Sequence, residues 1–278
     1  MKFQTRKTSA ENMIRIVCLS LIVGYLFPLH ADAQRSFKLL NTFASPDAFQ
    51  AVAVDSNYFY AINSRSISKH DKKTGEQINR WKGDPDGDIR HLDSGTIING
   101  KLYAAHSNYP ELPMTSSIEI WDTSSMQHIG SHSFGIRWGS STWVDRYNGY
   151  WWAVFAHYDE FSAELGKDNR WTTLVQFDEG WQPLESWVLP EKVLERFDGK
   201  SNSGGSWGPD GMLYLSGHDR SELYVMSLPE KGSELILEEI IPAESEGQGI
   251  AWDRSQPGII YTISRSKRIV NILKLNSK

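Results

Sequence analysis

The sequence has a single cysteine, no cluster of basic residues, and one extended apolar run, which lies near its N-terminus. One cysteine cannot form a disulfide within the chain, and chemistry that needs a cysteine pair is excluded. A formal net charge of -5 without a basic patch argues against nucleic acid and anionic membranes as partners. Aromatic residues, by contrast, are plentiful, with 11 Trp, 11 Tyr and 11 Phe in 278 residues, which favours an all-β protein.

The apolar run, Ile16–Leu29, has the features of a secretory signal. Basic residues precede it, and Ala31-Asp32-Ala33 matches an A-x-A cleavage signal. A membrane anchor is the alternative, but the run is shorter than the roughly 20 residues that a span requires. We therefore expect residues 1–33 to be a signal peptide that is cleaved near Ala33 and takes Cys18 with it. Residues 34–278 are then expected to form one domain in the periplasm or outside the cell, with no membrane contact after cleavage.

The stretch Gly204–Pro229 sets the pattern of an internal repeat. It reads as three short strands around the turn Pro209-Asp210-Gly211, in which Pro fixes φ and Gly accepts a positive φ. Similar phrases recur about every 40–50 residues, with four strand-like runs in a complete unit. That period and that number of strands are typical of a β-propeller.

The repeats predict five blades, of which the last has one strand too few. Phe37–Phe43 is a strand-like run that precedes the first repeat and belongs to none of them. We expect it to complete the last blade beside Arg268–Leu275. Such pairing closes the ring and removes an exposed edge. A long insertion is expected at Tyr158–Arg170 and a short helix within Glu191–Ser201. The prediction is a monomeric five-bladed β-propeller, closed by its N-terminal strand.

Histidines gather at one end of the predicted channel. The first strand of a blade lies nearest the axis and the second runs antiparallel to it, so the start of one meets the end of the other. His106, His157 and His218 end the second strands of three consecutive blades, and His91 begins a first strand beside them. The sequence therefore predicts a ring of imidazoles around one cavity.

Two chemistries suit such a ring. His106, His157 and His218 are candidate ligands of one divalent metal ion. Alternatively, the same three and His91 act without metal as catalytic acids and bases near neutral pH. The alternative is a structural role, in which these histidines only form hydrogen bonds to the backbone of loops. A single histidine would fit that role better than four aligned ones do.

Four further residues occupy the same end of the channel in blades one and five, namely Gln50, Arg65, Gln248 and Arg265. Arginine holds carboxylates by paired hydrogen bonds, and we expect these four residues to bind substrate. The sequence has no phosphate loop, dinucleotide fingerprint or H-E-x-x-H motif. The expected partner is therefore a small carboxylated or sugar-derived molecule.

Several phrases are shared with known propellers: His91-Leu-Asp-Ser-Gly, Ala105-His-Ser-Asn-Tyr-Pro-Glu111, Trp152-Ala-Val-Phe-Ala-His-Tyr158, Gly204-Gly-Ser-Trp-Gly-Pro-Asp210 and Gly217-His-Asp-Arg220. Together they resemble a family of secreted bacterial propellers commonly labelled cycloisomerase, which are similar to muconate-lactonising propellers. The resemblance covers the mature chain and implies the fold and a lyase or cycloisomerase reaction.

A more distant resemblance is to plant-type glutaminyl cyclase, through Phe49-Gln50-Ala51-Val52 and Glu246-Gly-Gln-Gly-Ile250. It implies an acyltransferase, although Asn63 or Ser64 stands where that family has an acidic residue. The function expected is thus a secreted or periplasmic lyase or cycloisomerase that uses the histidine ring. The alternatives are this acyltransferase and a non-catalytic propeller that binds a glycan or protein on the same face.

Overall fold

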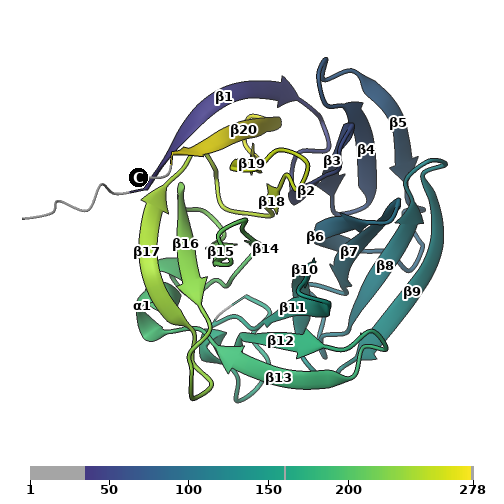
Figure 1. Ribbon diagram of the computed structural model, residues 1–278. Helices are drawn as coiled ribbons and strands as arrows, with labels where there is room; N and C mark the ends of the chain where they lie inside the picture. The colour runs from purple at the N-terminus through teal and green to yellow at the C-terminus, as the bar shows by residue number, and fades with distance from the viewer. Residues whose placement is uncertain (1–34, 160, 277–278) are drawn as a thin grey trace, which may run out of the picture. The chain divides into compact units, whose positions relative to one another are not determined.

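Five four-stranded antiparallel sheets surround a common axis in the computed structural model (Figure 1). The structure describes residues 35–159 and 161–276. The predicted all-β, five-bladed propeller is confirmed, whereas the signal peptide expected at residues 1–33 lies outside the described residues. In the described part, no helix has the length and apolar character needed to cross a membrane.

Each of the first four blades is built from four consecutive strands. Blade one holds β2 (Ala51–Val54), β3 (Tyr58–Asn63), β4 (Ser66–Asp71) and β5 (Gln77–Lys82). Blade two holds β6 (His91–Ile98), β7 (Lys101–Ser107), β8 (Ser116–Asp122) and β9 (Gln127–Gly135). Blade three holds β10 (Ser140–Tyr147), β11 (Tyr150–Ala156), β12 (Thr173–Phe177) and β13 (Pro183–Val188). Blade four holds β14 (Gly204–Trp207), β15 (Leu213–Ser216), β16 (Glu222–Ser227) and β17 (Ile236–Pro242).

Blade five combines the two ends of the described chain. It consists of β18 (Ala251–Trp252), β19 (Ile259–Ser264), β20 (Ile269–Asn276) and β1 (Ser36–Ala44). As the sequence predicts, β1 pairs with β20, in a register from Ser36 opposite Asn276 to Ala44 opposite Ile269. The pairing covers the edge of β20, which would otherwise offer unpaired backbone groups to other chains.

Two aromatic residues of β1 anchor it to the blades on either side. The ring of Phe37 lies 6.5 Å from that of Tyr214 in blade four and 6.3 Å from that of Trp252 in blade five. Phe43 stacks on Phe59 of blade one with ring centroids 5.5 Å apart. The N-terminal strand therefore contributes apolar packing on both sides of the seam as well as backbone pairing.

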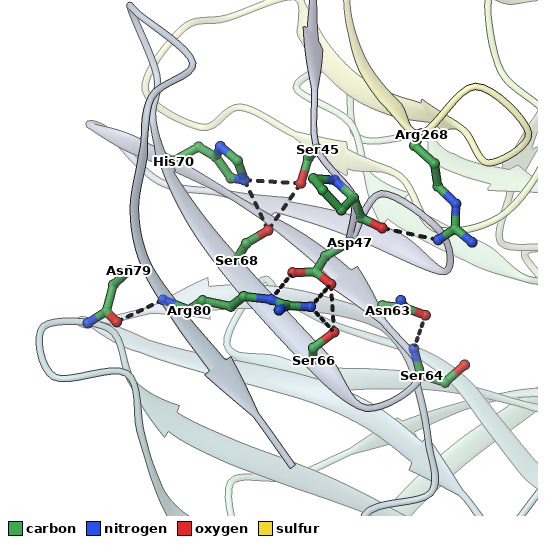
Figure 2. Close-up of polar contacts among 11 residues, drawn as sticks. Ser45, Asp47, Asn63, Ser64, Ser66, Ser68, His70, Asn79, Arg80 and Arg268 are labelled. Carbon is green, nitrogen blue, oxygen red and sulfur yellow. Dashed lines mark hydrogen bonds and ion pairs between the residues drawn. The ribbon is translucent and has the colours of Figure 1, made fainter. Parts of the chain in front are cut away.

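A buried polar network fastens the segment after β1 to blade one (Figure 2). Asp47 accepts hydrogen bonds from Arg80 Nε at 2.7 Å, from Arg80 Nη2 at 2.8 Å and from Ser66 Oγ at 2.6 Å. Ser45 Oγ lies 3.0 Å from Nε2 of His70. Burial raises the pKa of Asp47, but the hydrogen bonds from Arg80 and Ser66 outweigh burial and hold it below its usual range. Asp47 is therefore a charged link between the closing strand and β4 and β5.

Small residues allow the inner strands to approach each other around the axis. A Cβ atom added to Gly249 would lie 2.3 Å from Cβ of Ala51, and one added to Gly205 would lie 2.4 Å from the indole of Trp143. Atoms this close clash, so glycine is required where the inner strands of neighbouring blades meet. The glycine- and serine-rich starts of these strands thus reflect crowding.

Arg254 crosses one end of the channel. Its Nη2 lies 2.6 Å from Oδ1 of Asp145 in blade three, and its Nη1 donates to Thr96 Oγ1 in blade two at 3.1 Å. The hollow at this end measures about 330 Å³ and is lined by residues from all five blades. The guanidinium of Arg254 takes up space at this end of the channel. We therefore expect a ligand site at the opposite end.

Two irregular segments lie over that opposite end. The predicted insertion falls between β11 and β12 and contains η1 (Asn169–Trp171), and the predicted short helix is α1 (Glu191–Phe197). The backbone N–H of Asp159 donates to the carbonyl of Gly199 at 3.0 Å, which joins the insertion to the segment after α1. Tyr158 and Lys200 are brought to the same pocket by this contact.

Candidate functional site at the channel mouth

The mouth is the end of the channel formed by His91, Tyr109, Tyr158, His218 and Arg265. His91 opens β6, whereas Tyr109, Tyr158, His218 and Arg265 follow the second strands of blades two to five. Antiparallel pairing of first and second strands explains why residues so far apart in the chain come together here.

A β-bulge places Asp93 at the mouth. His91 pairs with Ser107 and Leu92 with His106, but the next pair is Gly95 with Ala104, so β6 carries one extra residue at Asp93 and Ser94. A bulge of this kind bends the strand and redirects side chains, often beside functional sites.

The carboxyl of Asp93 is buried, with 7% of its side chain exposed, and its Oδ2 lies 3.5 Å from Nε2 of His91. Burial raises the pKa of Asp93 well above its usual value, and Arg265 opposes that rise without reversing it. Burial therefore favours the protonated form of Asp93.

The pKa of His91 is shifted in the opposite direction, below its usual value. Burial, followed by the proximity of His106, Arg265 and His218, whose protonated forms would repel a charged imidazole, lowers the pKa of His91 to about 4. The imidazole is therefore neutral at pH 7 and has a lone pair with which to accept a proton. A protonated acid and a neutral base side by side are the arrangement from which acid and base roles are assigned in enzymes.

We expect acid to destabilise the protein through His91. The unfolded imidazole takes up a proton near pH 6.5, whereas the folded one resists protonation down to about pH 4. The neutral His91 therefore contributes about 3 kcal/mol to the free energy of unfolding above about pH 6.5. This contribution is lost as the pH falls to about 4. Urea midpoints measured from pH 7 to pH 4 should fall less steeply in His91→Gln than in the wild type. An equal slope in the two proteins would contradict the shift.

Arg265 and His218 are held together at the other side of the mouth. His218 Nδ1–H donates to Asp219 Oδ1 at 2.6 Å, and Nη1 of Arg265 lies 3.2 Å from His218 Nε2, which therefore accepts. Burial lowers the pKa of His218 and outweighs the opposing effect of Asp219. Gln248 donates to the carbonyl of His218 at 2.8 Å, and the guanidinium of Arg265 also lies 4.3 Å from the ring of Phe49. The sequence-predicted residues His91, His218, Gln248 and Arg265 thus belong to one neighbourhood.

A pocket of about 710 Å³ opens at the mouth and is lined by Tyr109, Tyr158, Asp159, Phe161, Asp198, Gly199, Lys200 and His218. The ring of Tyr109 lies 5.2 Å from that of Tyr158 and 5.0 Å from that of His91. Burial raises the pKa of both tyrosines, so their hydroxyls remain donors at neutral pH. Aromatic walls with a few polar groups are typical of small-molecule pockets.

His106 has other partners. Its Nε2 accepts from the backbone N–H of Arg90 at 3.0 Å, and its Nδ1 lies 2.8 Å from Oγ of Ser117, which in turn donates to Glu119. It lines a separate hollow of about 490 Å³ together with Glu119 and His128. Burial lowers its pKa despite the opposing charge of Glu119. His106 is close enough to His91 to affect its pKa, but both of its nitrogens are occupied.

His157 also lies apart from the mouth pocket. Its Nε2–H donates to the carbonyl of Trp138 at 2.9 Å, and its Nδ1 lies 3.3 Å from Oε2 of Glu164. Burial, with the charge of Lys167, lowers its pKa. It lines a third hollow on blade three, discussed below. The structure therefore does not bring His106, His157 and His218 into one pocket.

The remaining predicted residues serve local contacts. Gln50 donates to Ser64 Oγ at 3.0 Å, and Arg65 donates to the carbonyls of Pro85 and Arg90. Among the described residues, no group of three or more His, Cys, Asp or Glu side chains is placed to hold a metal ion. Metal binding by His106, His157 and His218 stays a prediction, and the chemistry considered below uses none.

Sequence reasoning missed Asp93 and Lys200. The available signal for Asp93 was an acidic residue within the otherwise small and apolar start of an inner strand, Leu92-Asp93-Ser94-Gly95. Charged residues are almost never buried without a partner, so one in such a strand points to a function. Nothing in the local sequence marks Lys200, whose position depends on the turn after α1.

No protein-family model and no curated protein matches the chain. Among solved structures, it is similar to hydrazine synthase of Kuenenia stuttgartiensis, at 13% identity over 81% of this chain and 82% of that chain, with a TM-score of 0.48. It is also similar to the WD40 repeats of RRP9, at 11% identity over 81% of this chain and 79% of that chain, with a TM-score of 0.46. Similarity at this level says nothing of activity.

Proposed function

We propose that the protein is an enzyme of the lyase or cycloisomerase type that moves a proton on a small carboxylated or sugar-derived molecule bound at the mouth. The observation that carries the proposal is the pair formed by Asp93 and His91, whose pKa values burial shifts in opposite directions within 3.5 Å of each other. Residues 1–33 have the pattern of a secretory signal, and the reaction is accordingly proposed to occur in the periplasm or outside the cell.

The mouth pocket supplies the binding groups. Tyr109, Tyr158 and Phe161 offer ring faces to an apolar or sugar ring. Lys200 lines the same pocket and Arg265 borders it at His218, and these cations hold the carboxylate of the substrate. The reacting end reaches the axis beside Tyr109, where the side chains of His91 and Asp93 retain 19% and 7% of their surface exposed.

The proton transfers follow from the two protonation states. His91 accepts the proton from the carbon next to the carboxylate, and the electron pair left behind becomes an enolate-like charge. Lys200 and Arg265 stabilise that charge as cations that donate hydrogen bonds to the carboxylate oxygens. Asp93 donates its proton to the leaving oxygen or to a second carbon, which completes elimination or isomerisation. The resemblance to propellers labelled cycloisomerase implies the same reaction class.

The proposal is tested by deuterium exchange. Sugar acids, their lactones and other small carboxylates are incubated with the protein in D₂O and followed by proton NMR. A substrate should gain deuterium at the carbon next to its carboxylate, and turnover should yield an unsaturated or isomerised product. Saturable binding without any exchange would instead identify a non-catalytic binding protein, and acyl transfer from an N-terminal glutamine peptide would favour the glutaminyl-cyclase alternative. Either result would contradict the proposal.

A further inference from the structure

A second pocket, the blade-three hollow, shares no lining residue with the mouth pocket. It measures about 760 Å³ and its walls include Arg137, Trp138, His157, Lys167, Arg170 and Trp171, with the end of β13 as its floor. The insertion between β11 and β12 builds one side of it, since Lys167, Arg170 and Trp171 all lie in that insertion. No role in the mouth explains this hollow.

The blade-three hollow is positively charged, although the chain as a whole carries a formal net charge of -5. Three cations line it and no carboxylate does. Lys167 pairs with Glu164 and Arg170 pairs with Asp168, whereas Arg137 forms no ion pair with any of the described residues. The guanidinium of Arg137 lies 4.7 Å from the ring of Trp138, which orients it and leaves its hydrogen-bond donors available to an anion.

An exposed indole lies in the same hollow. Trp171, at the end of η1, has 54% of its surface exposed, which is unusual for so large an apolar residue. A flat indole face suits the apolar C–H face of a pyranose ring, and a guanidinium in the same hollow suits a carboxylate of the saccharide. Aromatic and cationic groups together favour an acidic sugar over a neutral one.

The wall of the hollow also contains a buried polar atom without a partner. Nδ1 of His157 makes no hydrogen bond within the described residues, although Oε2 of Glu164 lies 3.3 Å away, and only 4% of the side chain is exposed. Buried polar atoms are rarely left unpaired unless a ligand or water completes them.

We propose that the blade-three hollow is a binding site for an acidic saccharide, in which a uronate ring stacks on Trp171 and its carboxylate pairs with Arg137. The site binds and does not react, and it is independent of the chemistry proposed at the mouth. It would hold the protein on an acidic polysaccharide while the mouth stays open to small molecules.

Calorimetric titration with trigalacturonate tests the site. Arg137→Gln and Trp171→Ala are each expected to weaken binding about tenfold, because each removes one charged pair or one stacked ring. Lys73→Gln and Tyr150→Ala are matched controls, since both residues are exposed and lie outside the hollow, and they should leave the affinity unchanged. Unfolding temperatures close to the wild type would show that the variants remain folded.

Changes to the ligand test the site on the wild-type protein, without any substitution that could disturb folding. The methyl ester of trigalacturonate, which keeps the rings and loses the charge, should bind the wild-type protein about tenfold more weakly. Equal affinity for the ester, or equal affinity for an oligoglutamate of the same charge, would overturn the assignment of an acidic saccharide. Absence of saturable binding of trigalacturonate at millimolar concentrations would overturn it as well.

Discussion

Removal of residues 35–44 should lower the free energy of unfolding by about 4 kcal/mol or more. The deletion takes away the partner of β20 along its whole length and the two partly buried aromatic anchors of the seam, Phe37 and Phe43. It also exposes the edge of β20 to pairing with other chains, so the truncated protein should aggregate more readily. Urea unfolding of a chain that starts at Ser45, compared with one that starts at Arg35, measures the difference.

Point variants separate the contribution of side-chain packing by β1 from that of its backbone pairing with β20. Phe37→Ala and Phe43→Ala should each account for a large part of the loss, whereas Leu39→Ala and Leu40→Ala should cost less than about 0.5 kcal/mol. The reason is that the two leucines are exposed, with 42% and 47% of their surface accessible. A synthetic peptide spanning Ser36–Ala44 should restore stability to the truncated chain. Identical unfolding of the two chains would show that β1 does not close the ring.

Replacement of Asp93 by asparagine should reduce turnover of an identified substrate by about 10²–10⁴-fold, the usual contribution of a positioned acid or base. The same change should stabilise the protein at neutral pH. Because burial raises the pKa of folded Asp93, the wild type loses stability as the pH rises above about 3.9 towards the folded pKa, by about 1.4 kcal/mol per pKa unit. The Asp93→Asn variant has no carboxyl there to titrate, so its stability should not fall in this way. The difference in free energy of unfolding between variant and wild type should therefore vanish near pH 3.

Asp145 offers the matched control for Asp93. It is equally buried and belongs to an inner strand, but its carboxylate accepts hydrogen bonds from Arg254, Ser206 and the backbone of Trp207. Asp145→Asn should therefore destabilise the protein, since it weakens a charged contact that Asp93 lacks. Urea unfolding at pH 3 and pH 7 gives both results. Destabilisation by Asp93→Asn at neutral pH would show that the carboxylate is charged and paired in the folded protein.

The propeller could be predicted because its signals are local. Turn residues such as Asn99-Gly100 and Asn148-Gly149 adopt the positive φ values that their sequence suggests, and they fix where strands end. The expected closing strand, Phe37–Phe43, is extended by only one residue at each end. The first strand of blade five is short, at Ala251–Trp252, and Gln248 before it takes a φ of 69°, outside the extended region.

The side-chain directions at the mouth could not be predicted in the same way. His106 and His157 do lie at the ends of second strands, as expected. However, residues of a strand alternate between the two faces of the sheet, and each face of a blade packs on a neighbour instead of the axis. His106 accordingly contacts Ser117 of its own blade, while His157 contacts Trp138.

Asp93 escaped prediction for a related reason. Its direction depends on the bulge in β6, where Asp93 and Ser94 together face Ala105, and one-residue shifts of register leave little trace in a single sequence. Gly95 is a local sign of the bulge itself, since a Cβ there would lie 2.3 Å from the carbonyl oxygen of Tyr103.

A carboxyl NMR titration tests, without knowledge of the substrate, whether burial keeps Asp93 protonated beside a neutral His91. The protein is labelled with ¹³C at aspartate carboxyls, and Asp93→Asn identifies the resonance of Asp93. That resonance should titrate well above pH 3.9, the ordinary midpoint of an aspartate, because burial disfavours the charged form. A midpoint at or below about 3.9 would show a charged carboxylate at the mouth and would contradict the assignment of Asp93 as the acid.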